Sequence, residues 1–96
     1  MIRHIVIWKL RDPENEAEKI ARIASGLEGL VGQIDGLISA KVSRGTGSDG
    51  YSVMLDSILR DKAALDLYQD HPLHVAQKKV IGEYTSGRFA FDCEME

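Results

Sequence analysis

The sequence predicts an α+β fold whose elements follow the order β-α-β-β-α-β. Two observations support this prediction. Segments rich in β-branched residues, typical of strands, alternate along the chain with segments whose apolar residues recur at helical spacing. The chain also has 96 residues, a length that fits one domain, so residues 1–96 are treated as a single domain.

The first strand is predicted over residues 2–10, where β-branched residues are frequent. Successive strand residues point to opposite faces of a sheet. One face therefore carries His4, Val6, Trp8 and Leu10, and the other carries Arg3, Ile5, Ile7 and Lys9. Both faces are apolar at their centre, which is typical of a central strand that is covered on both sides.

A helix is predicted after this strand. Asp12 is a typical N-cap residue, and Pro13 after it suits the first position of a helix. Gly32 and Gly36 mark the predicted end. Between them the apolar residues recur at helical spacing, at Ile20, Ile23, Ala24, Leu27, Leu30, Val31 and Ile34.

Two further strands, residues 37–44 and 51–59, are predicted to form a hairpin. Their connection contains Gly45, Gly47 and Gly50, whose spacing matches the glycine pattern of dinucleotide-binding sites. That pattern requires a helix directly after the glycines, because the helix N-terminus binds the pyrophosphate. A strand follows here instead, so we interpret the segment as a hairpin loop and expect no cofactor.

The remaining third of the chain is predicted to contain two helical segments and a final strand. Asp61 opens a short helix, and Pro72 interrupts it and begins a second segment that ends at Gly87. Residues 88–95 then alternate as a strand does. One face of this strand carries Phe89, Phe91, Cys93 and Met95.

This order of elements is the split βαβ, or ferredoxin-like, arrangement, in which the helices cover one face of an antiparallel sheet. The other face carries Ile5 and Ile7 on the central strand and needs a cover, because exposed apolar patches usually mark contact sites. A second copy of the same sheet is the simplest cover. We therefore expect a homodimer that forms through the sheet faces.

Composition argues against several function classes. The chain has 12 basic and 15 acidic residues, a formal net charge of −3 and scattered basic residues, whereas nucleic-acid binding usually needs a basic patch. The apolar segment at residues 2–8 is too short for a signal-peptide core or a membrane span. The single cysteine, Cys93, excludes an internal disulfide and is interpreted as a small core residue. We therefore expect a cytoplasmic protein that binds neither nucleic acid nor a membrane.

The segment from Tyr68 to His74 concentrates the candidate catalytic residues. With Pro72 at a helix start, His71 takes the cap position and His74 lies in the first turn, where the positive end of the helix dipole disfavours an imidazolium. A neutral His74 can accept a proton near neutral pH, and Tyr68, about one turn earlier, can donate its O–H toward the same space. His4 on the first strand joins the site if its strand face converges on these residues.

We expect a ligand pocket between the sheet and its helices. Its predicted lining is Val6, Trp8, Val53, Leu55 and His71. Two alternatives stay open for the site. Tyr68 can pack in the core while the histidines only cap and hydrogen-bond, or the three histidines can bind zinc. No Asp, Glu or Cys accompanies the histidines at a recognisable spacing, so no metal is predicted.

Several segments resemble the stress-responsive A/B-barrel (Dabb) family. These are the opening strand with residues 1–12, the turn Ile34-Asp35-Gly36-Leu37, the motif Leu65-x-x-Tyr68-x-x-His71-Pro72-x-His74 and the final strand Arg88-Phe89-Ala90-Phe91-Asp92. The resemblance covers nearly the whole chain. It implies a ferredoxin-like subunit that dimerises sheet to sheet into a dimeric α/β barrel.

The family includes a plant polyketide cyclase that closes an aromatic ring by acid–base chemistry without a cofactor. By motif, its strand-one histidine corresponds to His4, its catalytic tyrosine to Tyr68 and its catalytic histidine to His74. This chain lacks the cyclase's tyrosine in the first helix and has Val53 where the cyclase has a further histidine. That particular cyclisation is therefore not supported.

The resemblance and the residues together predict a small homodimeric Dabb-domain protein of unassigned role. One hypothesis is a cofactor-free acid–base enzyme, of cyclase, isomerase or lyase type, that acts on a small carbonyl or aromatic compound. In it, His74 is the general base, Tyr68 an oxyanion or proton donor, and His4 orients the substrate. The alternative is a non-catalytic small-ligand-binding or stress-response dimer in which the same residues only complete the core.

Overall fold

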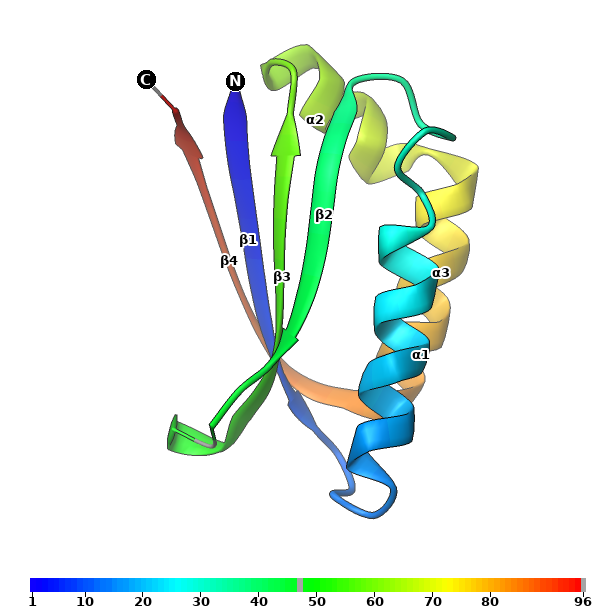
Figure 1. Ribbon diagram of the computed structural model, residues 1–96, viewed down its shortest axis with the longest axis vertical. Coiled ribbons are helices and arrows are strands. Elements are labelled where there is room, and N and C mark those ends of the chain that lie inside the picture. The colour runs from blue at the N-terminus through cyan, green and yellow to red at the C-terminus, as the bar shows by residue number, and fades with distance from the viewer. Residues whose placement is uncertain (47, 96) are drawn as a thin grey trace.

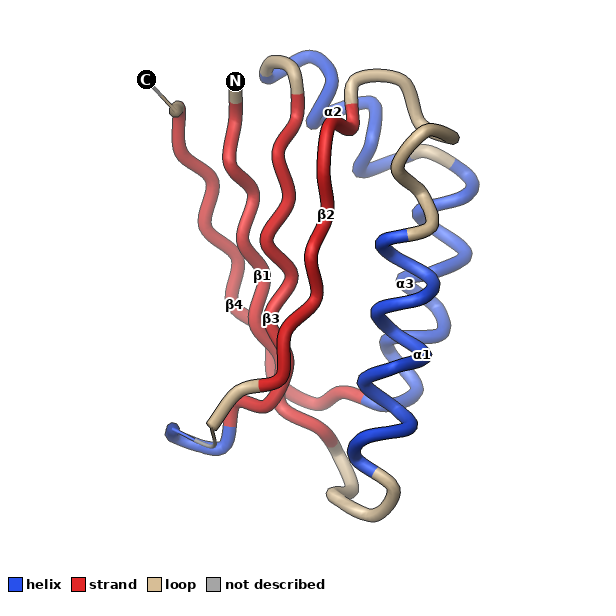
Figure 2. Tube along the Cα trace, viewed as in Figure 1, coloured by secondary structure: helices blue, strands red, loops and turns tan. Residues whose placement is uncertain are grey.

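The computed structural model describes residues 1–46 and 48–95. A four-stranded antiparallel sheet carries helices on one face, and the opposite face is bare (Figures 1 and 2). The strands lie in the order β2-β3-β1-β4, so β1 is central. Along the chain, the elements are β1 (Ile2–Leu10), α1 (Glu16–Glu28), β2 (Leu37–Arg44), β3 (Tyr51–Leu59), α2 (Lys62–Asp70), α3 (Pro72–Tyr84) and β4 (Thr85–Glu94). The prediction of a ferredoxin-like β-α-β-β-α-β subunit is confirmed.

The first helix differs from its prediction at both ends. α1 begins at Glu16 rather than Pro13, because the Asp12 carboxylate accepts the Glu14 backbone N–H (3.0 Å) in a local turn instead of capping a helix. The helix ends at Glu28, and turns with positive φ at Gly32 and Gly36 carry the chain to β2. Beyond the helix, Leu30 and Ile34 are buried whereas Val31 is exposed, so the apolar spacing extends past the helix only in part.

The second helical region begins as predicted. The Asp61 carboxylate accepts the Ala64 N–H (2.8 Å) at the start of α2, and Pro72 occupies the first turn of α3. α3 ends at Tyr84 and not at Gly87, which lies in β4. The backbone turns to the extended conformation at Thr85, whose hydroxyl donates to the Ile81 carbonyl (2.9 Å) and so satisfies one of the last helix carbonyls.

The hairpin of β2 and β3 is confirmed, with antiparallel pairing along both strands. A 3-10 turn at Ser48–Gly50 leads directly into β3, so no helix follows the glycines. Gly47 lies outside the described residues.

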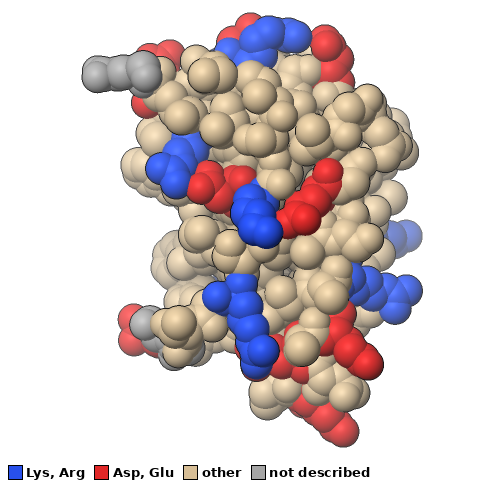
Figure 3. Space-filling view, in the orientation of Figure 1, with Lys and Arg blue, Asp and Glu red and all other residues tan. Residues whose placement is uncertain are grey.

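Acidic and basic side chains are interspersed on the face of the molecule that Figure 3 shows, which includes this hairpin's outer strand.

The two faces of the sheet have different surroundings. On the helix side, strand pairing places Val6 between Leu55 of β3 and Ala90 of β4, and α1 and α3 pack against this side (Figure 1). The largest fully buried side chains include Tyr68, Ile23, Leu27, Leu55, Leu59 and Leu65. The core therefore lies between the sheet and the helices, and it places His4 of β1 on the same side.

The bare face of the sheet is apolar along its centre. Ile5 pairs with Phe91 and Ile7 pairs with Phe89, and the two phenylalanines are about two-thirds exposed, at 65% and 63%. Cys93 lies on this same face, opposite Arg3, and is half-buried. The interpretation of Cys93 as a core residue is therefore wrong for the subunit, because β4 is an edge strand whose bare side no helix covers.

Candidate functional site

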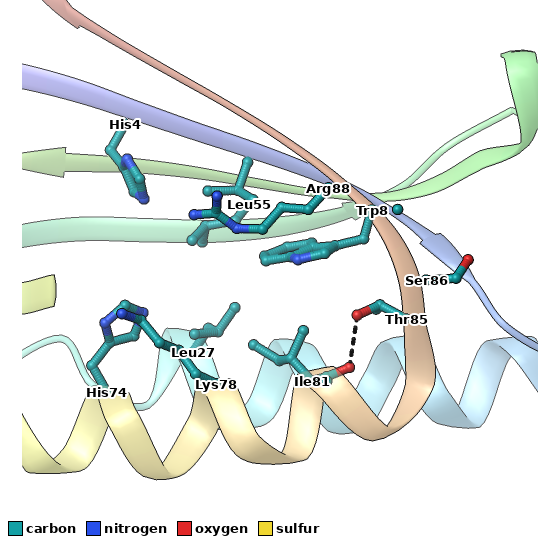
Figure 4. Close-up of a pocket in the computed structure, with 13 residues that line it drawn as sticks. His4, Trp8, Leu27, Leu55, His74, Lys78, Ile81, Thr85, Ser86 and Arg88 are labelled. Carbon is teal, nitrogen blue, oxygen red and sulfur yellow. Dashed lines mark hydrogen bonds between the residues drawn. The ribbon is translucent and has the colours of Figure 1, made fainter.

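A cavity of about 420 Å³ lies between the inner face of the sheet and helix α3 (Figure 4). Its apolar wall consists of Val6, Trp8, Leu27, Leu55 and Ile81. Its polar lining includes His4, His74, Lys78, Thr85, Ser86 and Arg88. The volume falls in the range of small-molecule sites, which combine an apolar wall with few polar groups.

His4 projects from β1 toward the cavity and is 2% exposed. Its Nδ1 contacts the Asp92 carboxylate, which lies directly opposite on β4. A carboxylate only accepts hydrogen bonds, so Nδ1 carries the proton and donates it to Asp92. The Ser57 hydroxyl donates to the His4 carbonyl (3.1 Å) from the other neighbouring strand. The contact with Asp92 fixes the orientation of the ring and leaves Nε2 as the free ring nitrogen.

His74 reaches the cavity from the opposite wall, and Figure 4 shows the two imidazoles facing each other from α3 and β1. The break between α2 and α3 positions it. His71 has an extended backbone, and its Nδ1 accepts the Leu73 N–H (3.1 Å), as predicted for a cap residue. Pro72 then starts α3, and one turn of helix brings His74 over the end of α2.

The His74 ring has a defined protonation pattern. Its Nδ1 lies 2.9 Å from the Tyr68 carbonyl, which can only accept, so Nδ1–H donates and Nε2 keeps its lone pair. Burial, assisted by the positive charge of Lys78, lowers the pKa of His74 to about 4. His74 is therefore neutral at pH 7 and presents a proton acceptor, as the helix-start position predicts.

Tyr68 lies behind His74 rather than in the cavity wall. Its ring stacks on the imidazole, with centroids 3.9 Å apart, and meets the His4 ring edge-on at 6.2 Å. The side chain is fully buried, and its hydroxyl has no hydrogen-bond partner among the described residues. Burial raises the pKa of Tyr68 to about 12, so the group stays an O–H donor throughout the physiological range.

The orphaned hydroxyl gives a stability prediction. Tyr68→Phe removes a buried polar group that has no partner, and such a group costs about 1–3 kcal/mol. We expect the free energy of unfolding of this variant, measured by urea denaturation, to be about 1 kcal/mol higher than that of the wild type. Tyr84→Phe, at a half-buried tyrosine outside the cavity lining, is the control and should change little. A destabilised Tyr68→Phe protein would show that the hydroxyl has a partner in solution.

The pKa of His74 gives a pH prediction. Its folded pKa of about 4 lies below the ordinary value of 6.5, so between these values the unfolded chain binds more protons than the folded one. The contribution of neutral His74 to the free energy of unfolding is fully present above pH 6.5. It decreases by about 3 kcal/mol in total as the pH falls from 6.5 through 4. Urea unfolding at several pH values should show this loss, and His74→Gln should show a smaller one. Equal losses in both proteins would contradict the prediction.

Only some of the other predicted lining residues line the cavity. Val6, Trp8 and Leu55 line the cavity. Val53 is buried beside Trp8 in the adjacent strand, and neither it nor His71 lines this cavity. Because His71 does not share the cavity with His4 and His74, the three imidazoles do not converge. Within residues 1–46 and 48–95, no group of three His, Cys, Asp or Glu side chains is placed to bind a metal.

Sequence reasoning missed the contributions of β4 and of the later turns of α3. Asp92, Arg88 and Lys78 all lie at or beside the cavity, and none was a candidate. The alternation of the final strand places Arg88 and Asp92 on one face, which is a usable signal. Only the pairing of β4 with β1 sets that face beside His4 and Trp8.

Comparisons with known proteins agree with this fold. The profile of the Stress Responsive A/B Barrel Domain (Dabb) matches residues 2–95. The chain belongs to this family. Among proteins of curated function, none matches the Dabb chain significantly. None of the described helices is long and apolar enough to cross a membrane.

Solved structures share the fold over nearly their full lengths. A dimeric ferredoxin-like protein of unknown function from Bacteroides fragilis is 26% identical, with a TM-score of 0.87 and coverage of 98% of this chain and 95% of that one. A Dabb family protein from Mesorhizobium loti is 22% identical (TM-score 0.80; 99% and 96% covered). A hydroxynitrile lyase from Passiflora edulis is 15% identical (TM-score 0.84; 99% and 93% covered).

Proposed function

We propose that this Dabb-domain protein is a cofactor-free acid–base enzyme that acts on a small carbonyl or aromatic compound. The observation that carries the proposal is the pair of imidazoles, His4 and His74, which line one cavity from opposite walls. Each has its Nδ1 occupied, by Asp92 and by the Tyr68 carbonyl respectively. Two oriented histidines in an apolar cavity are suited to proton transfer on a bound substrate.

His74 is the proposed general base. Its Nε2 takes the proton from a carbon next to a carbonyl group, and the electron pair of the C–H bond moves onto the carbonyl oxygen as an enolate. His4, when protonated, donates Nδ1–H to Asp92 and Nε2–H into the cavity, where it stabilises the enolate oxygen. Tyr68 does not line the cavity, and its ring stacks behind His74, so it positions the base and does not contact the substrate.

The enolate can then follow different courses. Return of the proton to another carbon completes an isomerisation, attack on a second carbonyl closes a ring, and loss of a neighbouring group completes an elimination. A protein with the same fold, from Passiflora edulis, is a hydroxynitrile lyase, so this fold accommodates a lyase in one other protein. This precedent supports an enzymatic function without naming the substrate.

We also propose that the working unit is a homodimer formed through the bare sheet face, as a dimeric α/β barrel. The two most exposed aromatic side chains, Phe89 and Phe91, lie on this face beside Ile5 and Ile7. Exposed apolar patches of this kind mark protein contact sites. The structural neighbour from Bacteroides fragilis is described as dimeric, which supports the same assembly here.

Deuterium exchange tests the enzymatic proposal without knowledge of the complete reaction. The purified protein is incubated in D₂O with a panel of small ketones, aldehydes and β-diketones, and C–D formation next to the carbonyl is followed by NMR. We expect at least one compound to exchange faster than in buffer alone. If none does, the acid–base function is not supported.

The low pKa of His74 favours a second candidate function, the non-catalytic binding of a small ligand. A group with a pKa of about 4 is a weak base at pH 7, because proton transfer is most efficient when the pKa lies near the working pH. In that case the same cavity binds a small hydrophobic or aromatic compound without converting it. Saturable binding of a panel compound without exchange would support this function.

A further inference from the structure

The ionisable side chains that line the cavity are all of one kind. Every ionisable side chain that lines it is basic, namely His4, His74, Lys78 and Arg88. This is unexpected for a chain in which acidic residues outnumber basic ones, 15 to 12. Asp92 reaches only the Nδ1 side of His4 and does not line the cavity. A cavity lined in this way attracts negatively charged ligands.

Arg88 is the strongest anion-binding candidate in this lining. It lies on β4 directly opposite Trp8, and Figure 4 shows its side chain extending along the apolar wall between Trp8 and His4. Within the described residues, its guanidinium makes no ion pair or hydrogen bond. Arg3 and Arg44, in contrast, are paired with carboxylates. The exposed guanidinium of Arg88 therefore keeps its donors for water or for a ligand.

Lys78 adds a second positive charge from the opposite wall. It lies one helical turn after His74 on α3, and its Nζ donates to the Gln69 carbonyl (2.8 Å) rather than to a carboxylate. Its charge is close enough to lower the pKa of His74. No described acidic side chain within hydrogen-bond distance neutralises either Lys78 or Arg88.

We propose that the natural ligand is a monocarboxylate whose carboxylate binds Arg88 and whose apolar body lies against Trp8 and Leu55. This inference rests on the proposed function, because it places the reacting carbon between His4 and His74. A guanidinium fork matches a carboxylate by two parallel hydrogen bonds. The carboxylate therefore orients the substrate, and the histidines carry out the proton transfer.

A singly charged group fits this cavity better than a phosphate. Phosphate sites usually use several backbone N–H groups at a helix N-terminus or a glycine-rich turn. This cavity extends along α3 to Ile81 and Gly82, near the C-terminus of the helix, where the helix dipole is negative. The Lys78 Nζ is already bonded to the Gln69 carbonyl, so Arg88 is the cation whose donors remain free, and its single charge is balanced by one carboxylate more closely than by a dianion.

Binding of matched compounds tests the proposal. The dissociation constants of 3-phenylpropanoate and 3-phenylpropanamide, which differ chiefly in charge, are measured by calorimetry with the wild type and with Arg88→Gln. A charge-assisted hydrogen bond predicts about 10- to 100-fold tighter binding of the carboxylate to the wild type. Arg88→Gln should remove this preference. Arg22→Gln, at an exposed arginine of α1 outside the cavity lining, should retain it.

Three results would overturn the proposal. These are equal binding of acid and amide, no binding of either, and displacement of the acid by equimolar inorganic phosphate. Failure of this proposal can be distinguished from failure of the enzymatic proposal. Carboxylate binding through Arg88 without deuterium exchange would support the carboxylate site and contradict the enzymatic function. Deuterium exchange into a panel compound, together with equal binding of the acid and the amide, would support the enzyme and reject the carboxylate site.

Discussion

His74→Gln is expected to slow deuterium incorporation into an active panel compound about 10²- to 10⁴-fold, the usual contribution of a positioned general base. Glutamine is close to histidine in reach and can still donate to the Tyr68 carbonyl, but its amide does not accept a proton near neutral pH. The loss should appear in kcat more than in KM, because the base acts in the transition state. NMR exchange rates over a range of substrate concentrations measure both.

The control for this variant is His71→Asn. His71 caps α3 but does not line the cavity, and asparagine is an equally good cap, so both the fold and the exchange rate should be retained. A His74→Gln protein that folds and still exchanges at the wild-type rate would reject His74 as the base. On the acid side, exchange by the wild type should fall below about pH 4, where His74 becomes protonated.

Phe91→Glu is expected to convert the proposed dimer into monomers. In a twofold interface each substitution occurs twice, so two carboxylates would be placed among apolar side chains of both sheets. Burial of unpaired charges costs several kcal/mol, so we expect the dissociation constant of the dimer to rise by at least about 100-fold. Analytical ultracentrifugation over a concentration series measures the dissociation constant.

Leu67→Glu is the matched control. Leu67 is 66% exposed, nearly the same as Phe91 at 65%, but it lies on α2 on the helix side of the sheet. The control should leave the mass and the dissociation constant unchanged. If Phe91→Glu remains dimeric while it folds normally, the bare sheet face is not the interface. If both variants dissociate, an added negative charge at any exposed site weakens the dimer, and the result does not support this face as the interface.

Local signals predicted the elements that they directly govern. Asp61 and Pro72 mark helix starts because a cap or a proline acts within one turn of the backbone, and the structure confirms both. Asp12 and Pro13 have the same chemistry, but Asp12 instead forms a turn with Glu14 before Glu16 starts the helix. A cap signal therefore shows that a helix is near, and the competition among neighbouring backbone donors decides its first residue.

The candidate site was predictable only in part. His74 could be placed at a helix start, and its neutral state follows from that position and from burial. Asp92 and Arg88 could not be assigned, because their roles depend on which strand pairs with β1 and in which register. A shift by one residue would turn both side chains to the bare face. The proposed carboxylate site thus depends on a pairing between residues more than 75 positions apart.

The sequence by itself determined the order of the elements, the family and the break at His71–Pro72 that orients His74, because periodicity, caps and motifs are local properties of the chain. Only the tertiary structure decided that Tyr68 stacks behind His74 while His4 faces it across an apolar cavity. It also decided that the cavity lining is basic. These relations arise from long-range strand pairing and helix packing, which no local pattern specifies.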